Sequence, residues 1–147
     1  MIATVCRTFG HELEGGEYSF PTPQELLSSP ERAVACGLGY RCDRFIEFAR
    51  RVDAGELDLD SLREMPYERC VSLLKGFRGI GDKVADCVAL FSLDHLEAFP
   101  VDVRVRKALE TRYAVRGSYR RLSEFGRSHF GEFAGYAQQY LFLDEGR

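Results

Sequence analysis

The stretch FRGIGDKVADC, from Phe77 to Cys87, joins two segments whose apolar residues recur at helical spacing. Two glycines, Gly79 and Gly81, stand two positions apart within it. Glycine allows tight turns and lets another molecule come close to the backbone. The stretch therefore predicts two helices joined by a tight turn, over about residues 67–92.

Three known patterns compete for this stretch. An NTPase phosphate loop has four residues between its glycines and then Lys-Ser or Lys-Thr, whereas here one residue separates the glycines and Val84 follows Lys83. A dinucleotide-binding loop also fails, because Val84 stands where its third glycine belongs and no strand is expected before it. The third pattern is a helix-hairpin-helix, in which Ile80 packs between the helices and the second helix offers free N–H groups to a DNA phosphate. A plain helical hairpin remains the alternative.

The lysine after the glycines has a chemical reading of its own. Only three of the 20 basic residues are lysines, and Lys83 lies in the first turn of the expected second helix. The helix dipole disfavours an ammonium group there, and a neutral amine can attack the C1′ atom of a sugar to form a Schiff base. Arginine stays protonated and cannot do this. The carboxylates of Asp82 and Asp86 oppose the effect of the helix dipole, because a nearby negative charge favours the ammonium form of Lys83.

Helical patterns extend over nearly the whole chain, so we expect an all-α protein, a single domain over residues 1–147. The segment Thr22–Glu25 has the sequence of a helix start, with a capping threonine, a proline and a carboxylate three residues on. On the helix before the glycines, Cys70, Leu73 and Leu74 are expected to face inward. Further helices are expected over residues 2–9, 45–52, 82–91, 103–113, 119–131 and 132–143, with a short one around residue 62.

Composition and cysteine spacing narrow the class of protein. Hydrophobic residues make up 45% and charged residues 29% of the chain, as in a soluble globular protein. The five cysteines form no CxxC pair, so we expect reduced thiols and neither a zinc ribbon nor an iron–sulfur cluster. No export leader is recognised, and we expect the cytoplasm, in association with the nucleoid, or the nucleus of a eukaryote.

The charges are distributed unevenly. Residues 1–69 carry 8 basic and 13 acidic groups, a net charge of −5. Residues 70–121 carry 10 basic and 6 acidic groups, a net charge of +4. Residues 122–147 carry 2 basic and 4 acidic groups, a net charge of −2, which brings the total to −3. A basic segment on an acidic chain suits binding of a polyanion at one site. Chance unevenness is the alternative.

The stretch AFPVDVRVRKAL supplies a carboxylate within the basic segment. Asp102 is expected to cap the helix that follows it. It can also stabilise positive charge on a sugar that gains oxocarbenium character. Arg104 and Arg106 suit phosphates, or else form a solvated face.

Together these stretches resemble the helix-hairpin-helix DNA glycosylases, and among them the 8-oxoguanine DNA glycosylase/AP lyase branch. The resemblance rests on the run LLKGFRGIGDKVADCVALFSLDHLEAFPVDVRV and extends from about Ile2 to Phe142. It implies that Lys83 is the catalytic lysine and Asp102 the catalytic aspartate. It also implies that Cys87 stacks under the extruded purine.

The resemblance assigns further roles outside this run. In FGEFAGYAQQYLF, Gln138 matches the residue that hydrogen-bonds the Watson–Crick edge of the base, and Phe142 matches the ring on its other face. In GLGYR, Tyr40 matches the residue that wedges into the base stack, and Arg41 one that contacts the orphaned cytosine. Taken alone, Cys87 and Phe142 are ordinary core residues, and nothing else singles out Gln138 or Tyr40.

The chain departs from the family pattern in three places. Arg104 stands where larger members carry histidine, and we expect it to contact DNA together with Gly79 and Gly81. No four-cysteine cluster follows the catalytic region, unlike in the endonuclease III and adenine-glycosylase branches. The family's preceding helix, with an asparagine that fills the gap left by the flipped base, and its N-terminal sheet domain have no counterpart before Met1, so we expect an N-terminally truncated member.

The resulting hypothesis is a base-excision repair enzyme that acts as a monomer on double-stranded DNA. It flips a damaged purine, 8-oxoguanine opposite cytosine, out of the duplex and displaces it with Lys83, then nicks the strand by β-elimination. This chemistry needs no metal or organic cofactor. The alternative is a non-catalytic helix-hairpin-helix DNA-binding module.

Overall fold

The computed structural model describes residues 1–144 of the chain. The chain divides into two compact units, Met1–Asp58 and Leu59–Arg147, which are described separately. Within the described residues the regular elements are α-helices and short 3-10 helices, and the only strand-like feature is an isolated bridge between Glu12 and Tyr18. The expectation of an all-α fold is confirmed. Over the same residues, none of the helices has the length and apolar character needed to cross a bilayer.

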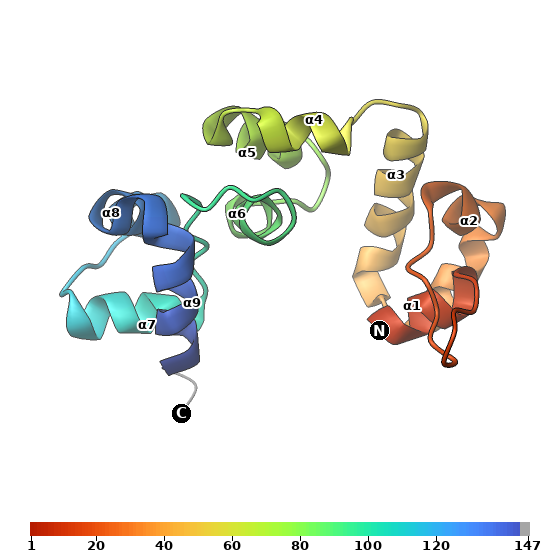
Figure 1. Ribbon diagram of the computed structural model, residues 1–147, viewed down its shortest axis with the longest axis horizontal. Helices are drawn as coiled ribbons and strands as arrows, with labels where there is room; N and C mark the ends of the chain where they lie inside the picture. The colour runs from red at the N-terminus through yellow and green to blue at the C-terminus, as the bar shows by residue number, and fades with distance from the viewer. Residues whose placement is uncertain (145–147) are drawn as a thin grey trace. The chain divides into compact units, whose positions relative to one another are not determined.

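The first unit contains three α-helices and two 3-10 helices among the residues 1–58 (Figure 1). In chain order they are α1 (Ile2–Phe9), α2 (Pro23–Ser28), η1 (Pro30–Cys36), η2 (Gly39–Arg41) and α3 (Cys42–Asp53). The expected capping box at the start of α2 is present, since the Thr22 side chain accepts from the Glu25 N–H and the Glu25 carboxylate accepts from the Thr22 N–H. Buried side chains from every element except η2 meet in one core: Val5, Phe9, Leu26, Ala33, Cys36, Leu38, Ile46 and Ala49.

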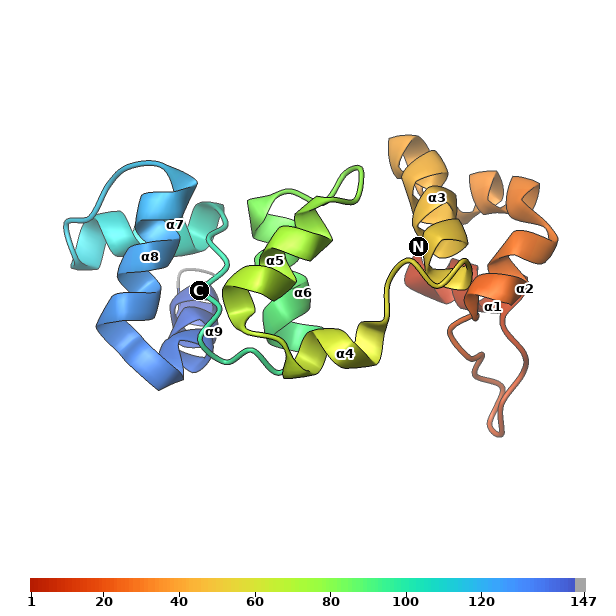
Figure 2. The same ribbon diagram turned by 90° about the horizontal axis from the view of Figure 1, so that it is seen from above.

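The second unit contains the glycine-rich hairpin and the C-terminal helices of the described chain. Its elements are α4 (Leu59–Glu64), α5 (Tyr67–Lys75), α6 (Asp82–Ser92), α7 (Val103–Arg112), α8 (Tyr119–Phe130), η3 (Gly131–Phe133) and α9 (Ala134–Asp144). Helices α5 and α6 lie side by side, while α7 and α8 each pack against α9 (Figures 1 and 2). The hairpin expected over residues 67–92 is therefore formed by α5 and α6.

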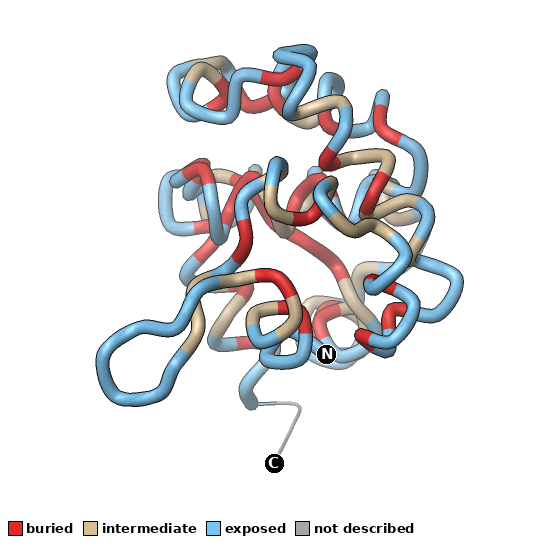
Figure 3. Tube along the Cα trace, turned by 90° about the vertical axis from the view of Figure 1, so that its right-hand side faces the viewer, coloured by how far each residue is buried: buried red, intermediate tan, exposed pale blue. Residues whose placement is uncertain are grey.

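Buried positions alternate with exposed ones along the helices, as amphipathic helices require (Figure 3). On α5, Cys70 and Leu74 are buried as expected. The expectation for Leu73 is wrong, because 42% of its surface is exposed. Leu74 alone occupies the inward position of that turn, since neighbouring helix positions differ by about 100° around the axis.

Candidate active site

The hairpin places Lys83 at the second position of α6. Gly79 has a φ of +93°, a conformation that favours glycine, so this residue makes the tight turn. Gly81 has an extended backbone with φ of −95°, and a Cβ added there would meet no atom within 4 Å. The turn therefore requires glycine at position 79 but not at position 81. The first turn of α6 also receives no hydrogen bond from a capping side chain, which leaves its N–H groups available to a ligand.

Lys83, Cys87 and Phe91 follow one another at intervals of four residues and so share one face of α6. Lys83 is exposed and Cys87 is half-buried. Burial raises the pKa of the Cys87 thiol, and the neighbouring Lys83 side chain offsets this only in part. The carboxylates of Asp86 and Asp102 raise that pKa further, so the thiol is held in its neutral form next to the lysine.

The segment that carries Asp102 is fixed by close packing. Phe99 is fully buried and stacks on Phe130 with 5.8 Å between ring centroids. A Cβ on Gly126 would lie 2.3 Å from the Phe99 ring, so α8 approaches this ring more closely than any other residue type at position 126 would allow. Asp102 itself caps α7, because its Oδ1 atom accepts from the Val105 N–H at 2.8 Å. The expected capping role is confirmed.

Helix α9 is held against α6 and the loop after it at a glycine. A Cβ on Gly135 would lie 2.3 Å from Cδ1 of Leu90, and the Gly135 N–H donates to the Leu96 carbonyl at 2.7 Å. One turn later, Gln138 is 96% buried, and its Oε1 atom accepts from Nε2 of Gln139 at 2.6 Å. This close packing places Gln138 in the same cavity lining as Lys83 and Cys87 of α6.

Residues of these three segments line an open cavity of about 220 Å³. Five of the expected site residues line it, namely Lys83, Cys87, Asp102, Gln138 and Phe142. Cavities for drug-sized ligands are typically ~300–1,000 Å³, so this one suits a smaller group such as a single base or sugar. It combines an amine, a carboxylate, an amide and an aromatic ring, which are the groups needed to attack a sugar carbon and to read a base.

The chain matches no family model, but several known proteins are similar to it. The probable N-glycosylase/DNA lyase of Methanothermobacter thermautotrophicus is 39% identical over 109 residues, which are 74% of this chain and 35% of that protein. The N-glycosylase/DNA lyase OGG1 of Arabidopsis thaliana is 34% identical over 149 positions, covering 91% of this chain and 40% of that protein. A solved structure of the 8-oxoguanine glycosylase/lyase of Clostridium acetobutylicum holds double-stranded DNA with cytosine opposite 8-oxoguanine. It superposes on this chain with a TM-score of 0.90 at 36% sequence identity, and the match covers 97% of this chain and 51% of that one.

Over most of its length the chain is similar in sequence and fold to the 8-oxoguanine branch of the helix-hairpin-helix DNA glycosylases. It spans about half or less of the length of these relatives. The resemblance seen in its motifs is thereby confirmed.

Two larger hollows of the second unit have other linings. One of about 440 Å³ lies beside α7 and α9 among mainly apolar residues, and its two charged residues, Arg112 and Asp144, pair with each other. The other, of about 380 Å³, opens on a different face of α6, where Asp86 points. The chemistry of the lining, rather than the volume, therefore makes the cavity at Lys83 the candidate active site.

The two carboxylates expected to favour the ammonium form of Lys83 have other partners. Asp82 forms a salt bridge with Lys75 across the hairpin, and Asp86 accepts hydrogen bonds from the hydroxyl of Tyr67 and from that of Tyr119.

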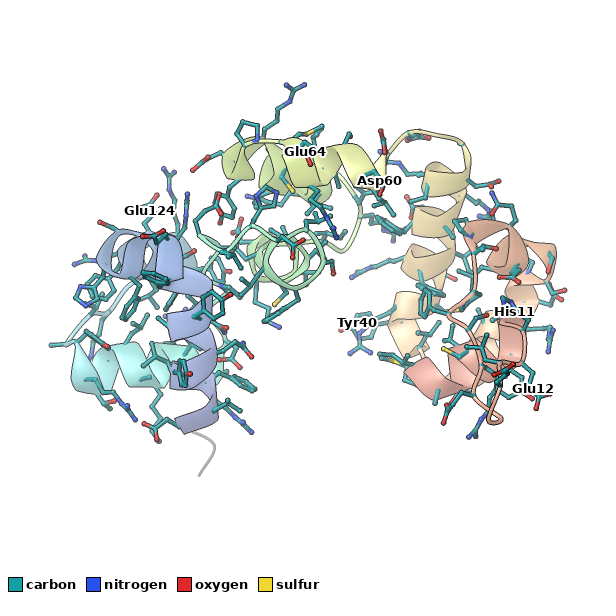
Figure 4. All side chains as sticks on the ribbon, viewed as in Figure 1. His11, Glu12, Tyr40, Asp60, Glu64 and Glu124 are labelled. Carbon is teal, nitrogen blue, oxygen red and sulfur yellow. The ribbon has the colours of Figure 1, made fainter. Side chains whose placement is uncertain are left out.

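The remaining residues expected to contact DNA lie outside the cavity lining. The Arg104 guanidinium stacks on the Phe142 ring at 4.9 Å, so Arg104 adjoins the cavity, and its contact with phosphate stays a prediction. Arg106 donates to the Gly117 carbonyl at 2.8 Å. In the first unit, Tyr40 is 74% exposed and projects outward from η2 (Figure 4). Guanidinium groups of Arg41 and Arg44 lie 5.1 and 5.5 Å from its ring centroid.

The cavity lining also includes residues that the sequence did not single out, namely Phe91, Pro100 and Gln139. Phe91 could have been found, because it follows Lys83 and Cys87 at the same helical interval. Gln139 gives no such signal, since its position beside Gln138 on a helix would normally point it elsewhere.

Proposed function

We propose that this chain is the catalytic part of a DNA glycosylase with AP lyase activity that removes 8-oxoguanine from double-stranded DNA. The observation that carries the proposal is the meeting of Lys83, Asp102 and Gln138 from three separate segments around one small cavity. The solved relative is bound to DNA with cytosine opposite 8-oxoguanine, which supports the same lesion here.

In the proposed reaction the neutral Lys83 amine attacks C1′ of a flipped nucleotide. A bond forms between Nζ and C1′, and the glycosidic bond breaks, so the base leaves with the bonding electron pair and takes up a proton. Opening of the sugar ring gives a Schiff base. Loss of a proton from C2′ then expels the 3′ phosphate and nicks the strand.

The other residues stabilise and read the nucleotide. The Asp102 carboxylate stabilises positive charge at the sugar while the glycosidic bond breaks. Gln138 hydrogen-bonds the base edge, and the Phe142 ring stacks on the base. The uncapped start of α6 and the open backbone at Gly81 accept a DNA phosphate.

Borohydride trapping tests this function directly, because borohydride reduces a Schiff base to a stable covalent bond. We expect the unmodified protein to be trapped on duplex DNA that contains 8-oxoguanine or an abasic site. Lys83→Gln should abolish trapping and strand cleavage, while duplex affinity changes by less than about tenfold, since phosphate contacts come mainly from other groups. Lys107→Gln, which removes the same charge from α7, is the matched control and should be trapped normally.

Trapping of Lys83→Gln at the normal rate would show that another amine is the nucleophile. Duplex binding by the unmodified protein without any trapping would instead favour the non-catalytic helix-hairpin-helix module.

A further inference from the structure

Asp86 is a buried carboxylate that the proposed reaction does not use. It is 2% exposed and lies on α6 one turn after Lys83. Its Oδ1 atom accepts from the Tyr67 hydroxyl at 2.5 Å, and its Oδ2 atom accepts from the Tyr119 hydroxyl at 2.5 Å and from the Ser123 hydroxyl at 3.3 Å. The donors come from the first residues of α5 and α8 and from the next turn of α8, so one carboxylate joins three helices.

Packing alone does not require a carboxylate at this position. Burying a charge is costly even when its hydrogen bonds are made, and apolar residues of similar volume often give equal or greater stability. The same helix packs through the fully buried Ala85 and Ala89. A carboxylate instead fixes the positions of its donors, because each hydroxyl must lie at a set distance and angle from its acceptor oxygen.

The two tyrosines are held as hydrogen-bond donors. Burial, and next the hydrogen bond to Asp86, raise the pKa of Tyr67 and of Tyr119 well above the usual range. Both hydroxyls therefore keep their protons at neutral pH, and each directs its proton to the Asp86 carboxylate.

Tyr119 extends the network to the other half of the site. Its hydroxyl oxygen accepts from the Val101 N–H at 3.4 Å while it donates to Asp86. Val101 is 95% buried and directly precedes Asp102. A hydrogen-bonded path thus runs from α6, which carries Lys83, through Asp86 and Tyr119 to the backbone that carries Asp102.

We propose that Asp86 and Tyr119 are positioning residues that set the separation between the Lys83 amine and the Asp102 carboxylate. This inference rests on the proposed function, in which these two groups act on one sugar. Neither residue lines the cavity, so both act through the backbone segments they hold.

Tyr67 offers a matched control within the same network. It donates to the other oxygen of Asp86 at the same 2.5 Å distance, and it is the first residue of its helix as Tyr119 is. Its hydroxyl connects Asp86 to α5, and its ring lies under the Arg127 guanidinium at 3.9 Å. Loss of either hydroxyl removes one hydrogen bond to Asp86, but only the loss of the Tyr119 hydroxyl also removes the path to Asp102.

The experiment compares Tyr119→Phe with Tyr67→Phe in the full chain. We expect both to lower the melting temperature by roughly 3–6 °C. Under single-turnover conditions on abasic-site DNA, Tyr119→Phe should slow trapping by about tenfold or more, with unchanged duplex affinity, and Tyr67→Phe by less than about threefold. Amide hydrogen exchange should show faster exchange at Val101 in Tyr119→Phe only. Asp86→Asn, in which an amide nitrogen replaces one acceptor oxygen, should give the same slow trapping.

The outcomes separate the two proposals. No trapping by the unmodified protein overturns the proposed function. If the unmodified protein is trapped normally, two results overturn only the positioning role. One is an equal loss of trapping rate in both tyrosine variants, and the other is no loss of trapping rate in Tyr119→Phe. Unchanged exchange at Val101 in Tyr119→Phe likewise overturns it. If a variant is only partly folded, the hydrogen-exchange comparison on its folded fraction decides in the same way.

Discussion

At the scale of single residues, Asp102 combines a structural role with the proposed catalytic one. Its Oδ1 atom caps α7 through the Val105 N–H, and the same carboxylate lines the cavity with Lys83. Asparagine is as good a capping residue as aspartate but carries no charge. Substitution by asparagine should therefore separate the two roles.

We expect Asp102→Asn to lower the free energy of unfolding by less than about 1 kcal/mol, since the cap remains and only the favourable interaction of the charge with the helix dipole is lost. Base release should slow by about 100-fold or more, as when one electrostatic group is removed from a developing charge. Asp102→Ala, which removes cap and charge, should be slowed as much and in addition lose ~1 kcal/mol. Denaturant unfolding and single-turnover rates measure the two effects. Full base release by Asp102→Asn would leave Asp102 with the capping role alone.

The residues proposed to read the base should matter only when a base is present. Gln138→Ala and Phe142→Ala are expected to weaken the preference for 8-oxoguanine over guanine, because a stack between a ring and a base is worth ~1–3 kcal/mol. Cleavage at a preformed abasic site should change little. Excision and abasic-site cleavage are measured side by side on matched duplexes.

Tyr140→Ala is the control for this comparison, because Tyr140 lies on the same helix, is 75% exposed and does not line the cavity. It should leave both activities near those of the unmodified protein. If Gln138→Ala and Phe142→Ala lose abasic-site cleavage as severely as excision, the two residues support the fold instead of reading the base.

Single residues also show which features of the site can be predicted from the sequence and which cannot. The cap at Asp102 was predictable because it depends on residues three positions apart. The partners of Asp86 lie 19, 33 and 37 residues away along the chain, and no local pattern specifies such pairs. Gln138 was singled out by family resemblance alone, since a buried glutamine is recognised as functional only when its neighbours in space are known.

At the scale of elements, the two glycines of the hairpin allow the requirements of folding to be tested separately from those of DNA binding. Gly79 requires its positive φ, so Gly79→Ala should cost about 1–2 kcal/mol of unfolding free energy. Gly81 is extended and faces open space, so Gly81→Ala should be neutral or stabilise by up to ~1 kcal/mol by restricting the unfolded chain. We expect Gly81→Ala nevertheless to weaken duplex binding, because the new methyl group occupies the space that a phosphate needs.

Thermal unfolding and fluorescence anisotropy with a labelled duplex check these expectations. A loss of affinity of about tenfold in Gly81→Ala, with no loss of stability, would support the helix-hairpin-helix reading over a plain helical hairpin. Unchanged affinity in Gly81→Ala would favour the plain hairpin.

Elements were predicted well where local chemistry defines their ends. The capping box of α2 and the glycine turn before α6 are local features, and both are present. The prediction that Leu73 faces inward was wrong. An apolar residue next to a buried leucine fits the helical pattern almost as well as that leucine does. Only the position of the neighbouring helix decides which of the two is buried.

At the scale of the whole molecule, the basic segment 70–121 coincides with the part of the chain that holds the hairpin and the Asp102 segment. The acidic segment 1–69 contains the first unit, where Tyr40 and Arg41 were assigned to the duplex by resemblance. That residues 1–147 act as a single domain stays a prediction. It requires the first unit to contribute to the outcome of the reaction proposed for the second.

The base opposite the lesion tests that contribution. An arginine can donate two parallel hydrogen bonds to the edge of a base, and lysine cannot reproduce this fork. Arg41 and Arg44 both hold guanidinium groups over the Tyr40 ring, at 5.1 and 5.5 Å, so removal of either takes one cation from the same ring. Only Arg41 is assigned to the orphaned cytosine, which makes Arg44 the matched control.

We expect the unmodified protein to excise 8-oxoguanine faster opposite cytosine than opposite the other three bases. Arg41→Ala should reduce that preference by about tenfold or more, the worth of one bidentate contact at ~1–3 kcal/mol. Arg41→Lys should do the same although it keeps the charge, while Arg44→Ala should preserve the preference and change only the overall affinity. Single-turnover excision from four duplexes that differ in the opposing base measures the effect. Equal rates opposite all four bases in the unmodified protein would show that the first unit does not read the opposite strand, and the two units would then have to be regarded as functionally separate.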